Sequence, residues 1–162
     1  MLAPIVKTIE VPCSQEKAFN VFVNDMNIWW PKSKFTTSVM AGGSAKEIRV
    51  DVTPGGKITE VNNDGTEYEW GAFKVLDPHG FFSMDFHIPS PDWKIGDFTL
   101  VEVTFTVVDS QRTHVELKQS NWEALGDMAE GIREGYEHGW VPIFEQAYKV
   151  KPPLGETFLS PG

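Results

Sequence analysis

Cysteine is nearly absent from this chain of 162 residues, which carries Cys13 alone. A single thiol excludes an intramolecular disulfide and a cysteine-rich zinc site, and it suits a reducing compartment. The 4 histidines are dispersed along the sequence, and their spacing matches no metal-binding motif. We therefore expect neither a metal nor a cofactor.

Basic residues are also scarce, with 14 Lys+Arg against 23 Asp+Glu and a net charge of −9. No basic run is present, so a nucleic-acid backbone or an anionic membrane would be repelled. No apolar run reaches the length of a membrane span, and the first residues, MLAPIVKTIEVP, lack the pattern of a signal peptide. The sequence predicts a cytoplasmic protein that binds neither nucleic acid nor membrane.

Linear catalytic motifs are missing as well. The chain has no Gly-x-Ser-x-Gly elbow, no phosphate-binding glycine loop, no dinucleotide fingerprint and no His-Glu-x-x-His helix. Carboxylates and tyrosines that converge in a cavity can still catalyse a reaction without leaving such a motif. Enzymatic activity is therefore left open, and a binding function is favoured.

Aromatic residues, in contrast, are abundant, with 6 Trp and 11 Phe. A chain of this length fits one domain and buries roughly 70% of its unfolded surface. We assign residues 1–150 to that domain and 151–162 to a tail rich in proline and glycine. The aromatic side chains predict a large core, or a core with a cavity.

Residues 124–150 have the length and period of a helix. Gly131, Gly135 and Gly139 leave one strip of this helix almost bare, and Pro142 removes a helix hydrogen bond. We expect a bend near Gly139 and a space beside the helix. The apolar stripe of this helix comprises Leu125, Met128, Ile132, Tyr136, Trp140, Phe144 and Ala147.

The chain before this helix alternates with the period of strands. Ile5, Ile9 and Val11 predict a first strand that ends at Pro12, and Ser14 is expected to cap the following helix. A second short helix ends at Pro31, residues 32–45 are expected to form a loop, and six antiparallel strands follow. The apolar parity changes at Gly71, which indicates a bulge there. This order of strands and helices predicts an α+β fold. We expect a curved seven-stranded antiparallel sheet that packs on the long helix, and we expect its first and last strands to pair.

This arrangement resembles the helix-grip fold of the START and Bet v 1-like superfamily. A series of motifs resembles more narrowly the bacterial family named after the activator of Hsp90 ATPase, the AHSA1-like branch of the SRPBCC superfamily. The resemblance covers residues 5–150, and it lies in the order and spacing of the motifs. They are Trp29-Trp30-Pro31, Pro54-Gly55-Gly56-Lys57, Glu60, Asp64-Gly65, Trp70-Gly71, Asp77-Pro78, Thr113, Val115 and Gly139-Trp140.

The resemblance implies a cavity between the sheet and the long helix, which many superfamily members use to hold apolar small molecules. Strand parity and the helix stripe give the expected lining, and Trp29, Trp30 and Phe35 are expected to close one end. The other expected lining residues are Ile48, Val50, Ile58, Glu60, Trp70, Phe82, Met84, Phe86, Val101, Phe105, Leu117, Met128, Ile132, Tyr136 and Trp140. Most of these side chains, taken singly, would serve equally well as packed core.

Two polar positions are informative. Glu60 shares a strand face with Ile58, so its carboxylate would enter the core, where it needs a partner such as Arg49, Lys57 or a tyrosine hydroxyl. The alternative is that Glu60 reaches water at the strand end. We expect His87 to lie on the solvent-facing side of a strand over residues 81–88.

Three functions remain open from the sequence. The first is a module that binds a small hydrophobic or amphipathic ligand in the cavity. The second, implied by the family resemblance, is an interaction protein of a chaperone. The third is a cavity enzyme of the polyketide cyclase or hydrolase type. A homodimer with Trp29 and Trp30 in its contact is an alternative to their place in the cavity.

Overall fold

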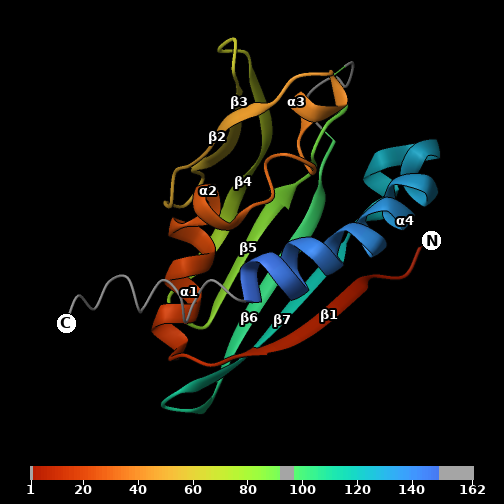
Figure 1. Cartoon of the computed structure of the whole chain (residues 1–162). Helices are drawn as coiled ribbons and strands as arrows, with labels where there is room; N and C mark the ends of the chain where they lie inside the picture. The colour runs from red at the N-terminus through yellow and green to blue at the C-terminus, as the bar shows by residue number, and fades with distance from the viewer. Residues whose placement is uncertain (1, 92–96, 150–162) are drawn as a thin grey trace.

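The computed structural model describes residues 2–91 and 97–149, whose strands form one curved antiparallel sheet (Figure 1). The strand order is β1-β7-β6-β5-β4-β3-β2, so the first strand pairs with the last as predicted. The expected tail lies outside the described residues. The strands are β1 (Ile5–Val11), β2 (Ala45–Val50), β3 (Lys57–Asn62), β4 (Glu67–Asp77), β5 (Phe81–Phe86), β6 (Thr99–Asp109) and β7 (Arg112–Ser120).

Two groups of helices accompany the sheet. The first contains α1 (Gln15–Asn24), α2 (Met26–Trp29) and α3 (Thr37–Met40), and α3 falls within the residues that were expected to be loop. The second contains η1, a 3-10 helix (Trp122–Met128), then α4 (Ala129–Trp140) and η2, a π-helix (Val141–Tyr148). Figure 1 shows α4 running across the sheet. The predicted helix-grip α+β fold is confirmed.

The end of the long helix packs against α1. Tyr148 donates a hydrogen bond from its hydroxyl to the carbonyl of Ala18 at 2.7 Å, and its ring lies 4.7 Å from that of Phe22. Ser14 caps α1 as predicted, since its hydroxyl accepts a hydrogen bond from Lys17 N. The two helix groups and the sheet therefore share one core.

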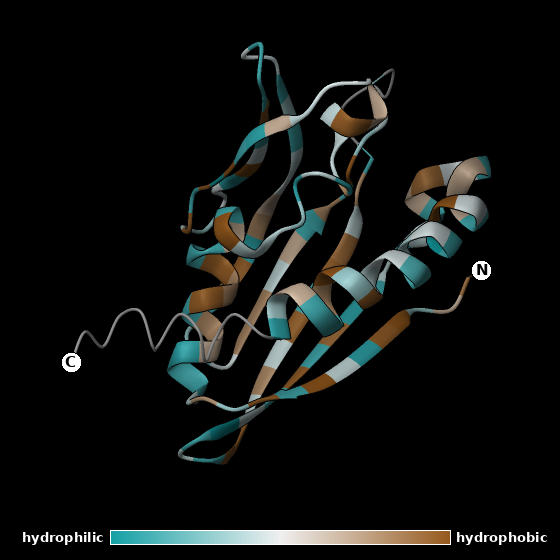
Figure 2. Ribbon diagram, viewed as in Figure 1, coloured by the Kyte–Doolittle hydropathy of each residue, from teal (hydrophilic) through white to brown (hydrophobic). Residues whose placement is uncertain are grey.

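The core is apolar and rich in aromatic side chains. Ile5, Ile9 and Val11 are buried on β1 and alternate with exposed or half-buried neighbours, as a strand with one buried face requires. Figure 2 shows the same alternation of hydrophobic and hydrophilic residues along β1. No helix in the described part of the chain is long and apolar enough to cross a membrane.

The bulge predicted at Gly71 is present. In the pairing of β3 with β4, Ile58 lies opposite Gly71 and Thr59 opposite Glu69, so Trp70 is the additional residue. Gly71 has φ +153°, and a Cβ at this position would lie 1.7 Å from the carbonyl oxygen of Asp85. Only glycine fits this close approach, and the bulge turns the Trp70 side chain into the core.

The sequence predicted a single helix over 124–150, whereas the structure divides this segment at Gly126 and changes its geometry at Val141. Gly126 has a positive φ of 63° and separates η1 from α4, and the chain changes to π geometry at Val141. Pro142 lies at the start of this π segment, directly after α4, and the carbonyl of His138 accepts a hydrogen bond from Val141 N instead. The wider turn buries Ile143 and Tyr148, whereas Ala147 of the expected stripe is only half-buried.

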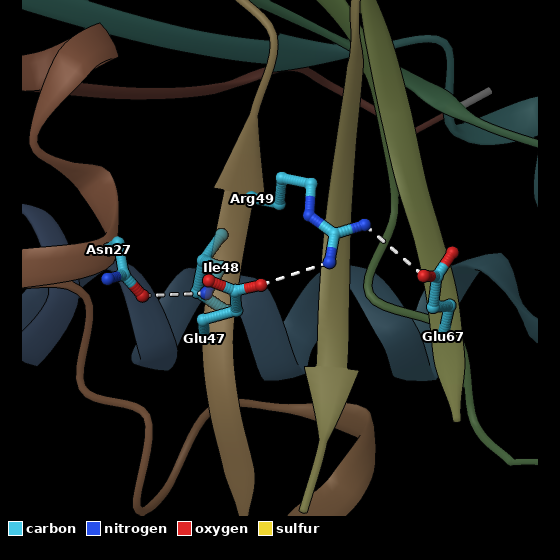
Figure 3. Close-up of polar contacts among 5 residues, drawn as sticks. All are labelled: Asn27, Glu47, Ile48, Arg49 and Glu67. Carbon is cyan, nitrogen blue, oxygen red and sulfur yellow. Dashed lines mark hydrogen bonds and ion pairs between the residues drawn. The ribbon is translucent and has the colours of Figure 1, made fainter. Parts of the chain in front are cut away.

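β2 is the edge strand at the other side of the sheet from β1, and α2 is hydrogen-bonded to it. Ile48 N donates a hydrogen bond to Asn27 Oδ1 at 2.7 Å, which covers part of the open strand edge (Figure 3). Arg49 points to the other face and pairs with Glu47 at 3.0 Å and Glu67 at 3.2 Å (Figure 3). Ile48 and Arg49 thus mark the buried and the exposed face of this part of the sheet.

Candidate functional site

A pocket of about 290 Å³ lies between α4, the segment around α3 and the chain that leaves β5. It is mostly apolar and opens to solvent, and its volume is at the lower end of the range for small-molecule sites. Met40 and Met128, which are 54% and 55% exposed, contribute flexible side chains. The lining consists of Lys34, Phe35, Thr36, Met40, His87, Ile88, Ser90, Met128, Ile132, Gly135, Tyr136, Gly139 and Ile143.

The glycine strip of α4 forms part of this pocket. Gly135 and Gly139 line it, and a Cβ at Gly135 would meet no atom within 4 Å. Ile132 is only partly buried and Met128 is exposed, and both line the pocket. The space expected beside the bare side of the helix is therefore present.

A buried polar pair lies in the pocket wall. The Tyr136 hydroxyl accepts a hydrogen bond from Ile88 N at 2.7 Å and lies 3.0 Å from His87 Nδ1. Burial lowers the pKa of the His87 imidazole to about 4, so the ring is neutral at pH 7. Burial also raises the pKa of the Tyr136 phenol, an effect that the bond from Ile88 only partly offsets. Both members of the pair are therefore uncharged at pH 7.

The expectation that His87 faces solvent is wrong. β5 ends at Phe86 rather than at residue 88, and His87 is only 5% exposed. His87 N donates a hydrogen bond to the carbonyl of Trp70, so the bulge in β4 sets the backbone direction at this point. The alternation of the strand does not extend to His87. No motif in the sequence marks this residue, and only the true end of the strand would have revealed it.

Glu60 holds the α3 segment in place. Its carboxylate is fully buried and accepts hydrogen bonds from Thr37 N at 2.7 Å, Ser38 N at 2.6 Å and the Trp70 indole at 3.0 Å. These charge-assisted bonds satisfy the first amides of a four-residue helix. Glu60 therefore positions the segment that carries Phe35, Thr36 and Met40, and it does not line the pocket itself.

The partners expected for Glu60 were wrong. Arg49 pairs with Glu47 and Glu67, and Lys57 pairs with Glu69 at 3.3 Å, all on the exposed face. Instead of a tyrosine hydroxyl, an indole N–H and two backbone amides donate hydrogen bonds to Glu60. A sequence pattern does not reveal these donors, because backbone amides are present at every residue and the loop had no predicted helix.

Comparison with protein families matches residues 12–146 to the family described as activator of Hsp90 ATPase homolog 1-like protein. The chain belongs to this family. No curated protein sequence matches it. The match confirms the resemblance that the motifs indicated, and it extends from the residue after β1 to a point within η2 of this AHSA1-like chain.

Solved structures resemble this AHSA1-like chain over most of its length. An anthrahydroquino-gamma-pyrone synthase, Txn09, is 27% identical with a TM-score of 0.57, over 84% of this chain and 88% of the synthase. An HSP90 activator from Plasmodium falciparum is 22% identical with a TM-score of 0.59, over 94% and 96%. A self-sacrificing resistance protein, CalC from Micromonospora echinospora, is 20% identical with a TM-score of 0.67, over 92% and 93%.

The structure divides the expected lining residues of this AHSA1-like chain into three groups. Phe35, Met128, Ile132 and Tyr136 line the pocket. Val50 is partly buried and packs against the core. The remaining residues are buried in the core and do not line the pocket: Trp29, Trp30, Ile48, Ile58, Glu60, Trp70, Phe82, Met84, Phe86, Val101, Phe105, Leu117 and Trp140.

Aromatic packing explains why these residues are not in the pocket wall. The Trp30 ring lies 5.0 Å from Trp70, 6.2 Å from Phe86 and 6.2 Å from Trp140, mostly in tilted or edge contacts. Trp30 also donates its indole hydrogen bond to the Phe35 carbonyl at 2.8 Å. The aromatic surplus therefore fills the space under α4, and Trp29 and Trp30 are too buried to form the contact of a homodimer.

The site contains no evident metal centre. Within residues 2–91 and 97–149, no three His, Cys, Asp or Glu side chains are grouped closely enough to hold an ion. Among the described residues of the pocket wall, Lys34 is the one with a charged side chain, and the other polar side chains carry hydroxyls or the neutral imidazole. Such a lining suits contacts with a largely apolar molecule that carries a few oxygen atoms.

Proposed function

We propose that this pocket binds a small apolar or amphipathic molecule. The observation that carries the proposal is the combination of a mostly apolar concavity beside the bare strip of α4 with a buried hydrogen-bonding pair in its wall. The apolar body of the ligand contacts Phe35, Ile132 and Ile143, and its polar group meets Tyr136 and His87. Burial of apolar area supplies the affinity, and the polar pair sets the orientation.

One of the solved relatives supports this ligand class. The synthase that is 27% identical to this chain is named for an aromatic product that carries oxygen atoms. A molecule of that chemical kind, in a size that fits about 290 Å³, would match both the apolar wall and the polar pair.

The test uses two glycines on successive turns of α4. Gly131 and Gly135 both leave open space for a side chain, but only Gly135 lines the pocket. Wild-type protein and the Gly135→Phe and Gly131→Phe variants are purified from the native host and weighed by native mass spectrometry. We expect an extra small-molecule mass on wild type and Gly131→Phe, and its loss from Gly135→Phe.

A bare mass for all three proteins, or an extra mass that Gly135→Phe retains, would contradict the proposed site. A bare mass together with a chaperone recovered from the host in a pull-down would favour the interaction protein that the family name implies. Circular dichroism checks that each variant is folded. We expect both variants to fold, because a phenylalanine in a helix interior costs little stability when its side chain has room.

A second candidate is a cavity enzyme, which one observation favours. Such an enzyme needs a buried titratable pair at its ligand, and His87 and Tyr136 form one in the pocket wall, whereas Glu60 does not reach it. The molecule released from the wild-type protein is incubated with fresh protein and followed by mass and absorbance. A change that Tyr136→Phe abolishes would establish turnover, and an unchanged compound would leave binding as the function.

A further inference from the structure

The charge at the pocket is opposite in sign to the charge of the whole chain. The chain carries a net charge of −9, yet the described residues that line the pocket include no Asp or Glu. They do include Lys34, which is exposed and lies in the segment before α3. No ion pair joins Lys34 to a carboxylate of the described residues, whereas Lys57 and Lys74 each have such a partner. The pocket therefore has a cation at its exposed side that can bind an anion.

The backbone of Lys34 is held in place beside the pocket. Lys34 N and Phe35 N both donate hydrogen bonds to the carbonyl of Pro31, at 3.2 Å and 3.1 Å. The carbonyl of Phe35 in turn accepts a hydrogen bond from the indole of Trp30 at 2.8 Å, and Trp30 is buried. The core thus fixes the point from which the Lys34 side chain extends, while its long, flexible stem lets the ammonium group adjust to a bound anion.

The cost of removing a charge from water decides where an anionic group of a ligand would lie. Tyr136 is buried, and an anion placed beside its neutral hydroxyl would lose water without gaining a counter-ion. Lys34 is exposed, so an anion beside it keeps part of its hydration and gains an ion pair. A charged group therefore remains at the mouth of the pocket, and the apolar part of the same molecule enters it.

We propose that the pocket selects an amphipathic acid, a compact apolar ring system with one carboxylate, which binds with the carboxylate at Lys34 and the rings against Phe35 and Ile132. This inference rests on the proposed function and adds the chemical class of the ligand. The carboxylate is a group additional to the one that meets Tyr136. An ammonium compound of the same shape would be repelled by Lys34. A neutral compound would keep the apolar contacts and gain no ion pair.

The test compares 2-naphthoate with 2-naphthamide, which has the same two rings and nearly the same shape but no charge. Each compound is titrated into the full-length protein, and the backbone amide signals of Gly135 and Gly139 report binding in the pocket. In Lys34→Met we expect naphthoate to bind about threefold more weakly, the value of one exposed ion pair, and naphthamide to bind as before. Lys74→Met is the control, because Lys74 pairs with Asp85 outside the pocket and its loss changes the net charge equally.

Salt gives a second readout, because Lys34 attracts an anion and the net charge of −9 repels it. Between about 0.01 M and about 0.15 M salt the screening length falls from about 30 Å to about 8 Å. We expect salt to weaken naphthoate binding by the wild-type protein and not by Lys34→Met.

Three outcomes would overturn the inference alone. They are an unchanged naphthoate affinity in Lys34→Met, an equal loss in Lys74→Met, and wild-type binding of naphthoate that salt strengthens. Absence of binding by both compounds would contradict the proposed function as well. Lys34 is exposed, so we expect Lys34→Met to fold, and circular dichroism checks this.

Discussion

The Trp70 indole donates a hydrogen bond to Glu60 Oε1 at 3.0 Å in the interior of the protein. Trp70 is the additional residue of the bulge in β4, and Glu60 lies on the neighbouring strand β3. The same carboxylate accepts two backbone amides of α3, so one buried anion connects the bulge to the segment that forms a wall of the pocket. The shape of the pocket therefore depends on a residue that does not line it.

Replacement of Glu60 by glutamine should destabilise the fold by about 1–3 kcal/mol, the cost of one buried donor left without an acceptor. The amide keeps one accepting oxygen, but its NH₂ group would face the amide of Thr37 or Ser38. Urea unfolding measures the change. Glu67→Gln is the control, because Glu67 is exposed and pairs only with Arg49, and its loss should cost less than about 1 kcal/mol. Equal stabilities of the two variants would contradict the role of Glu60.

Stability should fall as the pH is lowered from about 6.5 to about 4, with His87 as one cause. The pKa of His87 is lowered from 6.5 to about 4 in the folded protein, so the unfolded chain binds more protons in that window. Protonation then favours unfolding, and the contribution of His87 is fully present above pH 6.5. The loss is on the order of 2–3 kcal/mol for a shift of this size.

His87→Gln should flatten the pH dependence of unfolding between pH 4 and 6.5, since the variant removes the group whose pKa shifts. His114→Gln is the matched control, because it removes an imidazole that is partly exposed on β7. Free energies of unfolding at half-unit steps of pH give the comparison. Parallel curves for wild type and His87→Gln would refute the prediction.

Gly71→Ala should be among the most damaging small substitutions in the chain. A Cβ at this position would lie 1.7 Å from the Asp85 carbonyl oxygen, so strands β4 and β5 would have to separate. We expect a loss of more than about 3 kcal/mol, or no soluble protein. Gly65→Ala provides the contrast, because Gly65 has φ +90° but open space around it and should cost about 1 kcal/mol. Thermal denaturation of both variants distinguishes a clash from backbone strain alone.

Much of the fold could be predicted from the sequence, because the patterns that indicate its strands and bulge are local. The change of parity around Gly71 predicted the bulge, and the alternation of β1 predicted its buried face. Periodicity alone does not predict where the long helix is interrupted. Gly126 takes a positive φ, and Pro142 is accommodated by a π turn, and both depend on how the helix meets the core. Periodicity predicts which residues are apolar and not where a helix changes its pitch.

The site was less predictable because strand parity identifies the inner face and not what fills it. Trp70 and Trp140 both point inward as expected, yet their rings meet Trp30 and leave the pocket to other residues. The bare strip at Gly135 did predict where along the helix the pocket lies. His87 could not be found, since its burial depends on the end of β5 and on Tyr136, which is distant in the sequence.

The packed aromatic core has an optical consequence. Trp70, Trp30, Trp140 and Tyr136 form a series of ring contacts, with centroid distances of 5.0 Å between Trp70 and Trp30, 6.2 Å between Trp30 and Trp140, and 5.9 Å between Trp140 and Tyr136. Excitation energy passes readily between rings at such distances, so we expect the ultraviolet emission of these rings to come from a coupled group whose outermost ring, Tyr136, forms part of the pocket wall. A molecule that enters the pocket would alter the emission of the whole group, and the protein thus carries its own fluorescent reporter.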